Sequence, residues 1–426
     1  MGTDTATWPA RLRGDVLDAL DSRLAPVDAW LKAAYPGRVA GRQPVHTVYV
    51  PADQFTADLP QAWGQQALAT LEAHAPTTAA LAASTGLDAT LLTEIHPRLI
   101  GKLRTEPIED LRIDFEDGYG APGDEKEDAT ALAAARELAE AQARGSAPPF
   151  VGIRFKSLEA ATRERGVRTL DGFLGALSRA GALPAGFVVT LPKVTAVAQV
   201  EAMTELCEWL ERAHGLQQGQ LRYEIQVETP QAVLAADGTS AIARMVHTAG
   251  DRLLGLHYGT YDYSAACDVA PAQQSMEHPV ADHAKAIMQL AVAGTGVRLS
   301  DGSTNVLPTG DTERVRAAWL LHARLVTRSL KRAFYQGWDM HPGQLVTRYA
   351  ATYAFFRAGF ADASERFRAY LGVSGGSGVL DEPATAQALA TFLLRGLHCG
   401  AIDGAEIEAA GMDQETLYAL ADREVR

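Results

Sequence analysis

Residues 221–230, Leu-Arg-Tyr-Glu-Ile-Gln-Val-Glu-Thr-Pro, have a pattern that indicates the type of fold. Apolar side chains alternate with polar ones and the run ends at Glu228, which is typical of a buried strand that gives way to a loop. A second run, Leu253–His257 followed by Tyr-Gly-Thr-Tyr-Asp262, ends in the same way. Two carboxylates at one end of a sheet repel each other, and a hard divalent cation relieves that repulsion. The pair is therefore either a Mg²⁺ or Mn²⁺ site or two loop carboxylates in ordinary ion pairs.

Similar strand-like runs alternate with helix-like stretches between about residues 45 and 345. The other runs are His46–Val50, Leu111–Phe115, Phe150–Phe155, Phe187–Leu191, Val297–Leu299 and Ala333–Trp338. Between them, stretches such as Asp128–Ala143 have helical periodicity. Eight strands with intervening helices predict an α/β fold of the (β/α)8 TIM-barrel type rather than an open doubly wound sheet. No G-x-G-x-x-G follows the first strand, which argues against a dinucleotide-binding domain.

The chain divides into three parts by its pattern. Residues 1–44 are predicted to be an N-terminal helical extension, with an amphipathic section at 15–35. Residues 45–345 are predicted to form the catalytic barrel. Residues 346–426 are mostly helical in pattern, with a glycine-rich break at 373–378. We expect this last part to contribute to an oligomer and to closure of the site.

Composition excludes several classes of partner. The chain has 426 residues, is 47% hydrophobic and carries a formal net charge of −13. Such an acidic chain without a basic stripe does not suit nucleic acid. No apolar run approaches the roughly 18 residues that a membrane helix needs, and the N-terminus lacks the apolar core of a signal peptide. We therefore expect a soluble cytoplasmic protein without a membrane or nucleic acid partner.

The cysteines Cys207, Cys267 and Cys399 are widely separated and form no C-x-x-C motif. This spacing predicts neither a disulfide framework nor a zinc site and is consistent with a reducing compartment. Cys267 follows Asp262 closely and could be a nucleophile. The alternative, a small buried apolar side chain, is the more common use of a free cysteine.

Chemistry in a TIM barrel gathers where the strands end, at their carboxyl termini. The polar residues at or just after these predicted ends are Asp114, Glu116 and Asp117; Arg154 and Lys156; Lys193; Glu228; Asp262; and Asp339 and His341. Carboxylates gathered with an arginine and a lysine around one mouth suggest a bound cation and an anionic substrate.

The motifs at these ends resemble those of the HpcH/HpaI aldolase / citrate lyase β-subunit superfamily, which includes malyl-CoA lyases. The similar stretches are 48–53 (VYVPAD), 113–117 (IDFED) with 121–126, 151–154 (VGIR), 191–194 (LPKV), 226–233 (QVETPQAV), 259–263 (GTYDY), 340–344 (MHPGQ) and 378–383 (GVLDEP). They occur in the order of the family over about residues 45–390. Malate synthases share this type of barrel and metal site.

The resemblance implies roles for several residues. Glu228 and Asp262 match the two Mg²⁺ ligands of the family, with Mn²⁺ as an alternative ion. Arg154 matches the arginine that holds the carbonyl or enolate oxygen of the substrate. The turn formed by Gly259, Thr260, Tyr261 and Asp262 matches the one whose backbone amides meet the substrate carboxylate.

The resemblance also implies how protons are moved and how the site is supported. Asp117 and Asp381 are the candidates for acid/base catalysis, and Asp381 would reach the site of a neighbouring subunit. Glu116, Lys193 and His341 are expected to support the site from behind its substrate-contacting residues. A site completed by a neighbour implies a homo-oligomer, a trimer or a hexamer as is common in the family.

Structural alternatives stand beside two of these roles. Arg154 could pair with Glu116 or Asp117 for stability alone. Asp117 could cap a helix or form a salt bridge with Lys126.

Four further residues have alternative roles. Lys193 could form a Schiff base if it were desolvated, although a metal site makes that redundant. His341 precedes a proline and is expected to be structural rather than a general base. His257 lies in an apolar strand as a satisfied core residue, and Glu382 could act in place of Asp381.

The leading functional hypothesis is a metal-dependent carbon–carbon lyase or aldolase acting on a 2-oxo or 2-hydroxy acid, or its CoA thioester. Asp53-Gln54 stands where acyl-CoA-using relatives often carry basic residues, so a free small acid is the alternative to a thioester. A second hypothesis is a malate-synthase-like Claisen condensation of an acyl-CoA with glyoxylate. A third is a non-catalytic barrel that binds an acid metabolite.

Overall fold

The computed structural model describes residues 14–37, 41–181, 183–372 and 382–422. Within these residues, eight parallel strands form one sheet in the order β7-β6-β5-β4-β3-β2-β1-β8. The strands are β1 His46–Pro51, β2 Asp110–Asp114, β3 Phe150–Arg154, β4 Phe187–Leu191, β5 Arg222–Val227, β6 Leu253–Tyr258, β7 Arg298–Ser300 and β8 Gly337–Asp339.

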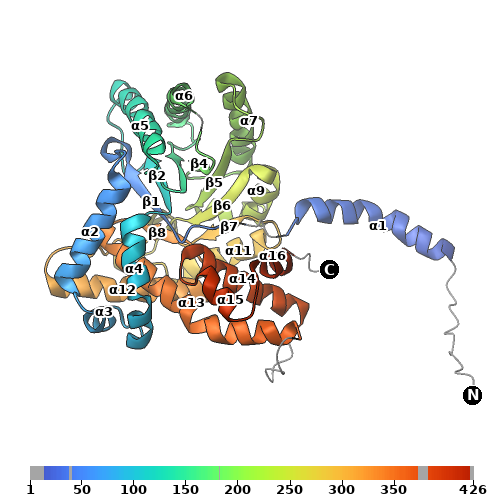
Figure 1. Ribbon diagram of the computed structural model, residues 1–426. Coiled ribbons are helices and arrows are strands. Elements are labelled where there is room, and N and C mark those ends of the chain that lie inside the picture. The colour runs from blue at the N-terminus through green and yellow to red at the C-terminus, as the bar shows by residue number, and fades with distance from the viewer. Residues whose placement is uncertain (1–13, 38–40, 182, 373–381, 423–426) are drawn as a thin grey trace, which may run out of the picture.

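The sheet closes on itself between β7 and β8, the strands at the two ends of this order. Ser300, at the end of β7, forms a parallel bridge with Gln336, just before β8. Next to this bridge, the amide of Asp301 donates to the carbonyl of Gln336 at 2.8 Å. This closure, with helices outside, confirms the predicted (β/α)8 barrel (Figure 1).

The strands were recognisable because both faces of a parallel barrel strand are buried. β2 and β4 are buried at every position. At one point two strands approach so closely that only glycine fits. A Cβ on Gly152 of β3 would lie 1.7 Å from the carbonyl oxygen of Val188 on β4.

Helices surround the sheet, and Figure 1 shows them outside the strands that they connect. Those between the strands are α2 Leu59–His74, α3 Thr78–Thr85, α4 Ala89–Thr105, α5 Asp124–Arg144, α6 Arg163–Ala180, α7 Val197–His214, α8 Pro230–Val233, α9 Ala241–Ala249, α10 Thr260–Ala266, α11 Pro279–Val292 and α12 Thr312–Lys331. Three 3₁₀ turns are η1 Ala52–Gln54, η2 Gly250–Arg252 and η3 Pro271–Gln273.

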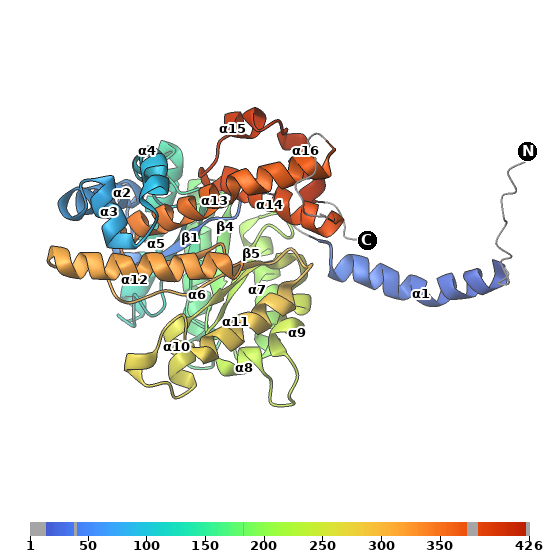
Figure 2. The same ribbon diagram turned by 90° about the horizontal axis from the view of Figure 1, so that it is seen from below.

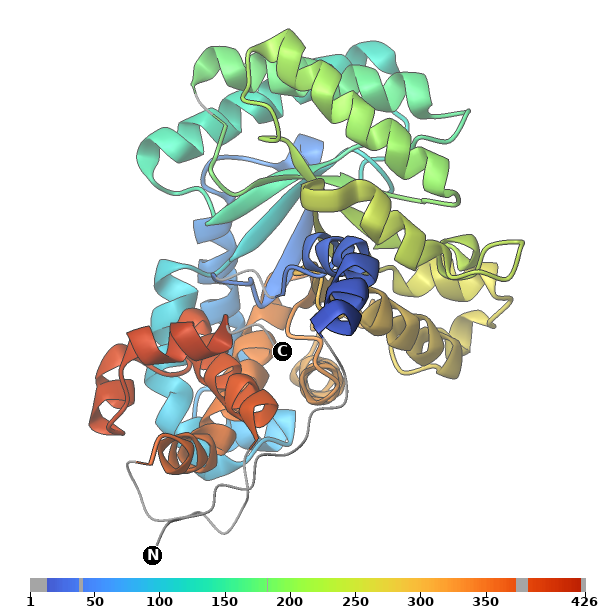
Figure 3. The same cartoon turned by 90° about the vertical axis from the view of Figure 1, so that its right-hand side faces the viewer.

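The C-terminal part is helical, as expected. It consists of α13 Pro342–Tyr370, α14 Pro383–Cys399, α15 Gly404–Ala409 and α16 Gln414–Ala421. Figure 3 shows these helices together at one side of the barrel, next to α4. Arg98 of α4 donates to Glu406 of α15 at 2.9 Å, and Arg357 of α13 donates to the same carboxylate at 2.6 Å. α13 runs without interruption through the predicted boundary at 345/346.

The described part of the N-terminal extension contains one helix, α1 Gly14–Ala34, none of whose residues is buried. Figures 1 and 2 show it projecting away from the barrel in two perpendicular views. Across the part of the chain that the structure describes, no helix has the length and apolarity needed to cross a membrane.

Candidate active site

Glu228 directly follows β5 and is almost fully buried, with 2% of its surface exposed. Its Oε1 accepts a 2.7 Å hydrogen bond from the backbone amide of Lys193. Burial raises the pKa of Glu228 to about 7; the charges of Lys193 and Arg154 oppose this rise, and those of Asp262 and Glu116 add to it. The removal of this carboxyl group from water is therefore the main cause of its raised pKa.

Lys193 follows β4 and places its ammonium group among three carboxylates. Its Nζ lies 2.8 Å from Asp117, 3.0 Å from Glu116 and 3.6 Å from Asp262. Burial alone would lower the pKa of Lys193, but the surrounding carboxylates, Glu228 first, outweigh it and raise that pKa. We expected Lys193 behind the site, whereas the structure places its charge within the carboxylate cluster.

The backbone of Lys193 is itself unusual. Its φ of +51° is in the left-handed region, which a residue with a Cβ adopts at a cost of about 1–3 kcal/mol. In this conformation the backbone amide of Lys193 donates to Glu228, and its ammonium contacts Glu116 and Asp117.

Arg154 ends β3 and is held in a fixed orientation by Asp114 at the end of β2. Its Nε donates to Oδ1 and its Nη2 to Oδ2 of that carboxylate, each at 2.6 Å. Its Nη1 lies 3.3 Å from Oε1 of Gln226 and 3.2 Å from Oε2 of Glu116. The guanidinium thus has a structural partner in Asp114 and also faces the acidic cluster.

Two aromatic rings pack beside this guanidinium. Its central carbon lies 4.9 Å from the ring centre of Tyr49 and 5.6 Å from that of Trp338. The indole nitrogen of Trp338 is buried and has no hydrogen-bond partner among the described residues. A buried indole N–H without a partner among the described residues therefore belongs to a ring that packs beside Arg154.

Glu116 and Asp117 occupy the loop after β2. The amide of Asp117 donates to Oε2 of Glu116 at 2.8 Å. Burial raises the pKa of Glu116. Burial would also raise the pKa of Asp117, but the hydrogen bond and charge of Lys193 lower it, so Asp117 stays ionised. Lys193 is the partner that the structure gives Asp117, and α5 begins after Gly123 without Asp117 as its cap.

The loop after β6 brings Asp262 to the same mouth, in the first turn of α10 and half-exposed. Gly259 lies against the metal-ligand candidate on β5, because a Cβ on it would be 2.5 Å from Cβ of Glu228. Thr260 is buried, and its Oγ1 would lie 2.0 Å from a Cβ on Gly302. The hydroxyl of Tyr261 accepts from the amide of Asn305 at 2.6 Å. Thr260 thus packs closely against Gly302, and Tyr261 hydrogen-bonds the loop to the one after β7.

A buried polar layer lies inside the barrel below this mouth. Arg112 donates to both oxygens of Glu224, at 2.9 and 2.7 Å. His257 lies 3.0 Å from Glu224 and 3.4 Å from the hydroxyl of Tyr49. Tyr49 thus links Arg154 to this layer, and His257 has the satisfied core environment that was expected.

Two residues expected near the site, His341 and Asp339, lie apart from the acidic cluster, and a third falls outside the residues that the structure describes. His341 caps α13, accepting from the amide of Gly343 at 3.0 Å, and burial lowers its pKa. Asp339 is fully buried and pairs with His46, His322 and Arg348. Asp381 falls outside the described residues.

Cys267 is not prepared to act as a nucleophile. Burial raises the pKa of its thiol, and the charge of Asp268 raises it further. A thiol needs a lowered pKa to be reactive at neutral pH.

The charges of the cluster fit a divalent cation. Four carboxylates, Glu116, Asp117, Glu228 and Asp262, face the ammonium of Lys193 and the guanidinium of Arg154. That guanidinium is also paired with Asp114, so the carboxylates outnumber the cations. Within the described ranges, no three His, Cys, Asp or Glu side chains form a preassembled metal cage. Mg²⁺ commonly takes one or two carboxylates and fills its other positions with water and substrate oxygens. Glu228 and Asp262 suit that mode of binding.

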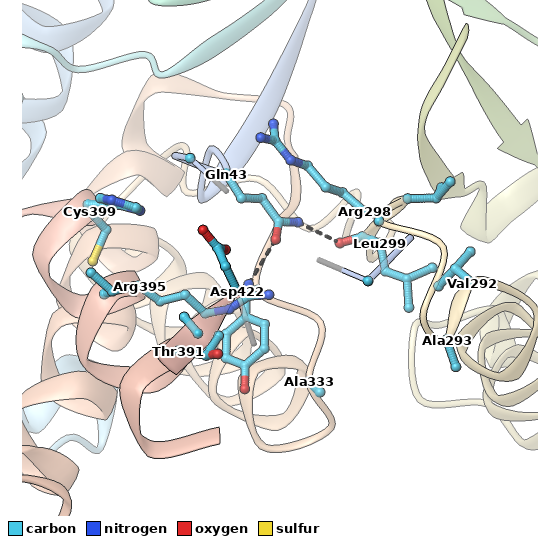
Figure 4. Close-up of a pocket in the computed structure, with 18 of the residues that line it drawn as sticks. Gln43, Val292, Ala293, Arg298, Leu299, Ala333, Thr391, Arg395, Cys399 and Asp422 are labelled. Atoms are coloured by element: carbon cyan, nitrogen blue, oxygen red, sulfur yellow. Dashed lines mark hydrogen bonds between the residues drawn. The ribbon is translucent and has the colours of Figure 1, made fainter. Parts of the chain in front are cut away.

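A cavity of about 310 Å³ lies at the opposite end of the barrel (Figure 4). It is lined by residues that precede or begin strands, such as Gln43 and Val45 before β1 and Arg298 at the start of β7. Because TIM-barrel chemistry takes place at the carboxyl ends of the strands, this cavity is separate from the candidate site.

Comparison with protein families gives one match over most of the chain. The model of a family described as "Domain of unknown function (DUF6986)" matches residues 24–425. No curated protein matches the sequence.

Several solved structures share the fold. A lead(II) complex of malate synthase from Haloferax volcanii is 16% identical, with a TM-score of 0.50 over 90% of each chain. The native form of that enzyme at 3 mM glyoxylate is also 16% identical, with a TM-score of 0.50 over 92% of this chain and 100% of that one. An HpcH/HpaI aldolase/citrate lyase family protein from Burkholderia cenocepacia J2315 is 13% identical, with a TM-score of 0.40 over 79% and 98% of the two chains. At these identities the two malate synthase structures show the shared barrel alone.

Proposed function

This chain belongs to the DUF6986 family, and we propose that it is a divalent-metal-dependent carbon–carbon lyase or aldolase that acts on a 2-oxo or 2-hydroxy acid. One observation carries the proposal. Four carboxylates gather around the ammonium of Lys193, beside the buried guanidinium of Arg154, at the carboxyl ends of the barrel strands.

Glu228 and Asp262 would hold Mg²⁺ or Mn²⁺, with water and substrate oxygens as the remaining ligands. A cation there supplies a Lewis acid that stabilises negative charge on a substrate oxygen. A substrate that brings a carboxylate and an adjacent oxo or hydroxyl oxygen would complement such a site, which is why we infer a small carboxylic acid.

Arg154 would donate to the substrate oxygen on which enolate charge develops. Its orientation is fixed in advance by the two hydrogen bonds to Asp114, so no reorganisation is needed when the charge appears. Tyr49 and Trp338 keep water away from the guanidinium, which strengthens its interaction with an anion. The indole N–H of Trp338, which has no partner among the described residues, would be a second donor to the substrate.

Asp117 is the described residue best placed to move the proton. It is ionised, partly exposed and held by Lys193 at 2.8 Å. In the cleavage direction it would take the proton from the hydroxyl of the leaving fragment. The hydroxyl oxygen becomes a carbonyl, the carbon–carbon bond breaks, and its electron pair forms the enolate of the other fragment. Asp381 of a neighbouring subunit remains a second candidate in the homo-oligomer that we propose.

An activity screen tests this function. Purified protein would be offered 2-oxo and 2-hydroxy acids with and without CoA, and release of an aldehyde or oxo acid would be followed by mass spectrometry. We expect turnover that EDTA abolishes and Mg²⁺ or Mn²⁺ restores. Full activity in EDTA would contradict the proposal. Thiol release from acetyl-CoA with glyoxylate would favour the Claisen condensation, and metal-dependent binding without turnover would favour an acid-binding barrel.

Variants of the two proposed ligands make the screen specific. Glu228→Gln and Asp262→Asn should each lose metal binding and activity together, while the fold persists. Glu208→Gln and Asp171→Asn are matched controls on the outer helices, where Glu208 contacts Arg212 and Asp171 contacts His214. Both controls should behave as the wild type.

A further inference from the structure

Helix α1 carries an apolar stripe that its own barrel leaves uncovered. Leu17, Leu20, Leu24, Val27 and Leu31 are 59%, 47%, 47%, 47% and 43% exposed. They follow one another at alternating spacings of three and four residues. This is the a/d pattern of a coiled coil, which needs a second helix to cover the seam.

Among the described residues, the contacts with the barrel come from the last turn of α1 and the residues just after it; the ring of Trp30 lies 6.4 Å from that of His247. The ring of Tyr35 lies 5.2 Å from that of His247 on α9, and the amide of Gly37 donates to the carbonyl of Gly294 at 2.9 Å. The rest of the helix extends away from the barrel in both views (Figures 1 and 2). The stripe is therefore held out in a direction where another molecule could reach it.

The charges beside the stripe select the orientation of a partner helix. With Leu17, Leu24 and Leu31 at position a, Arg23 falls at g and Asp28 at e. In a parallel pair, g of one helix faces e of the next heptad on the other, so Arg23 would face Asp28. In an antiparallel pair, e faces e, and Asp21 and Asp28 would repel each other.

We propose that α1 pairs in parallel with α1 of a second copy of this chain, with the leucine stripe at the seam and Arg23 of each helix facing Asp28 of the other. Pro26 lies at position c, so its ring is outside the seam. Pairing in twos gives an even number of copies. Of the two oligomers expected from the sequence, it fits the hexamer.

A second copy suits this helix better than a membrane surface does. α1 contains four aspartates but only one arginine and one lysine. Helices that lie on anionic lipid carry basic polar faces. The negative face of α1 would be repelled there, whereas self-pairing uses both signs of charge.

The mass of the full-length protein in solution tests whether the stripe joins copies. The wild type should be an oligomer by light scattering after size exclusion. Leu20→Asp with Leu24→Asp should reduce the mass to half or less. The control, Ser22→Asp with Ala29→Asp, adds the same charge at position f on the outer face and should keep the wild-type mass. A monomeric wild type, or an unchanged mass in the Leu20/Leu24 variant, would overturn the proposal.

Charge exchange tests the parallel register. Arg23→Glu and Asp28→Lys should each raise the dissociation constant by roughly five- to tenfold, because each replaces two attractive pairs by repulsive ones. The double variant should restore wild-type affinity. A double variant as weak as the two singles would rule out parallel pairing and would indicate that the stripe docks on the body of a neighbour.

A crosslink provides an independent check. Identical a positions meet only in a parallel pair, so Leu24→Cys should form an intermolecular disulfide under mild oxidation. Ser22→Cys, on the outer face, should not. Equal crosslinking of the two variants would count against the proposed seam.

Discussion

The backbone amide of Lys193 donates a 2.7 Å hydrogen bond to Oε1 of Glu228. The residue after β4 thereby positions the proposed metal ligand at the end of β5, while its side chain offsets the charge of the neighbouring carboxylates. Lys193 thus orients Glu228 through its backbone and partly neutralises Glu116 and Asp117 through its side chain. Lys193 makes both sets of contacts with its backbone at a positive φ.

The backbone strain at Lys193 can be separated from its charge. Lys193→Ala and Lys193→Gly both remove the ammonium, but only glycine adopts a φ of +51° without strain. We expect the glycine variant to be more stable than the alanine variant by about 1 kcal/mol. Urea unfolding of the two proteins measures this difference. An alanine variant as stable as the glycine variant would show that the left-handed conformation is not required.

The packing of Gly259 against Glu228 predicts a loss of metal affinity in Gly259→Ala. A Cβ at this position would lie 2.5 Å from Cβ of Glu228, which is close to its backbone and cannot move freely. We expect Mg²⁺ affinity to fall at least tenfold and stability to fall by about 1–3 kcal/mol, measured by calorimetry and urea unfolding. Gly172→Ala, whose Cβ would meet nothing within 4 Å, is the control and should change neither quantity adversely. Wild-type affinity in Gly259→Ala would contradict the proposed position of the ligand.

Arg154→Lys tests whether the guanidinium acts on the substrate. Lysine keeps the charge but cannot make the paired hydrogen bonds to Asp114. We expect kcat/KM to fall by about 10²–10³, as for loss of a donor to a developing oxyanion. Arg144→Lys, in an exposed pair with Asp58, should be neutral. A variant that unfolds more easily but retains kcat/KM would show that Arg154 is structural only.

The sequence predicts the positions of the strands better than it predicts which side chains pair at their ends. Runs such as Phe187–Leu191 are recognisable because both faces of the strand are buried. The last strand was expected from Ala333 but begins at Gly337, because Ala333 has a φ of +63° and belongs to a turn. A turn conformation of this kind leaves little signal in a short run of mixed residues.

The pairing of charges depends on which side chains meet across strands, and sequence spacing does not reveal that. Asp114 was recognised as a strand-end carboxylate, but its bidentate contact with Arg154 requires the register between β2 and β3. Arg112 and Glu224 are 112 positions apart and pair inside the barrel. The motif around Lys193 suggested a supporting residue, and only the left-handed backbone brings its amide to Glu228.

A buried histidine away from the site predicts how stability depends on pH. Burial lowers the pKa of His322 below its ordinary value near 6.5, and Asp339 only partly opposes this. Below that ordinary value the unfolded chain binds a proton that the folded chain does not, so stability rises with pH through this window and is lost as pH falls below about 6.5. His322→Gln should reduce this slope in urea unfolding between pH 5.5 and 7.5. His283→Gln, on the exposed side of α11, controls for removing an imidazole as such. An identical slope in His322→Gln and the wild type would contradict the assignment.

The proposed metal site is tested most directly by a crystal soaked with Mn²⁺ and oxalate, an unreactive mimic of a 2-oxo acid enolate. We expect an anomalous peak coordinated by Glu228 and Asp262, with oxalate bound to the ion and within hydrogen-bond distance of Arg154. The absence of a peak at saturating Mn²⁺, or a peak that neither carboxylate touches, would contradict the proposed metal site.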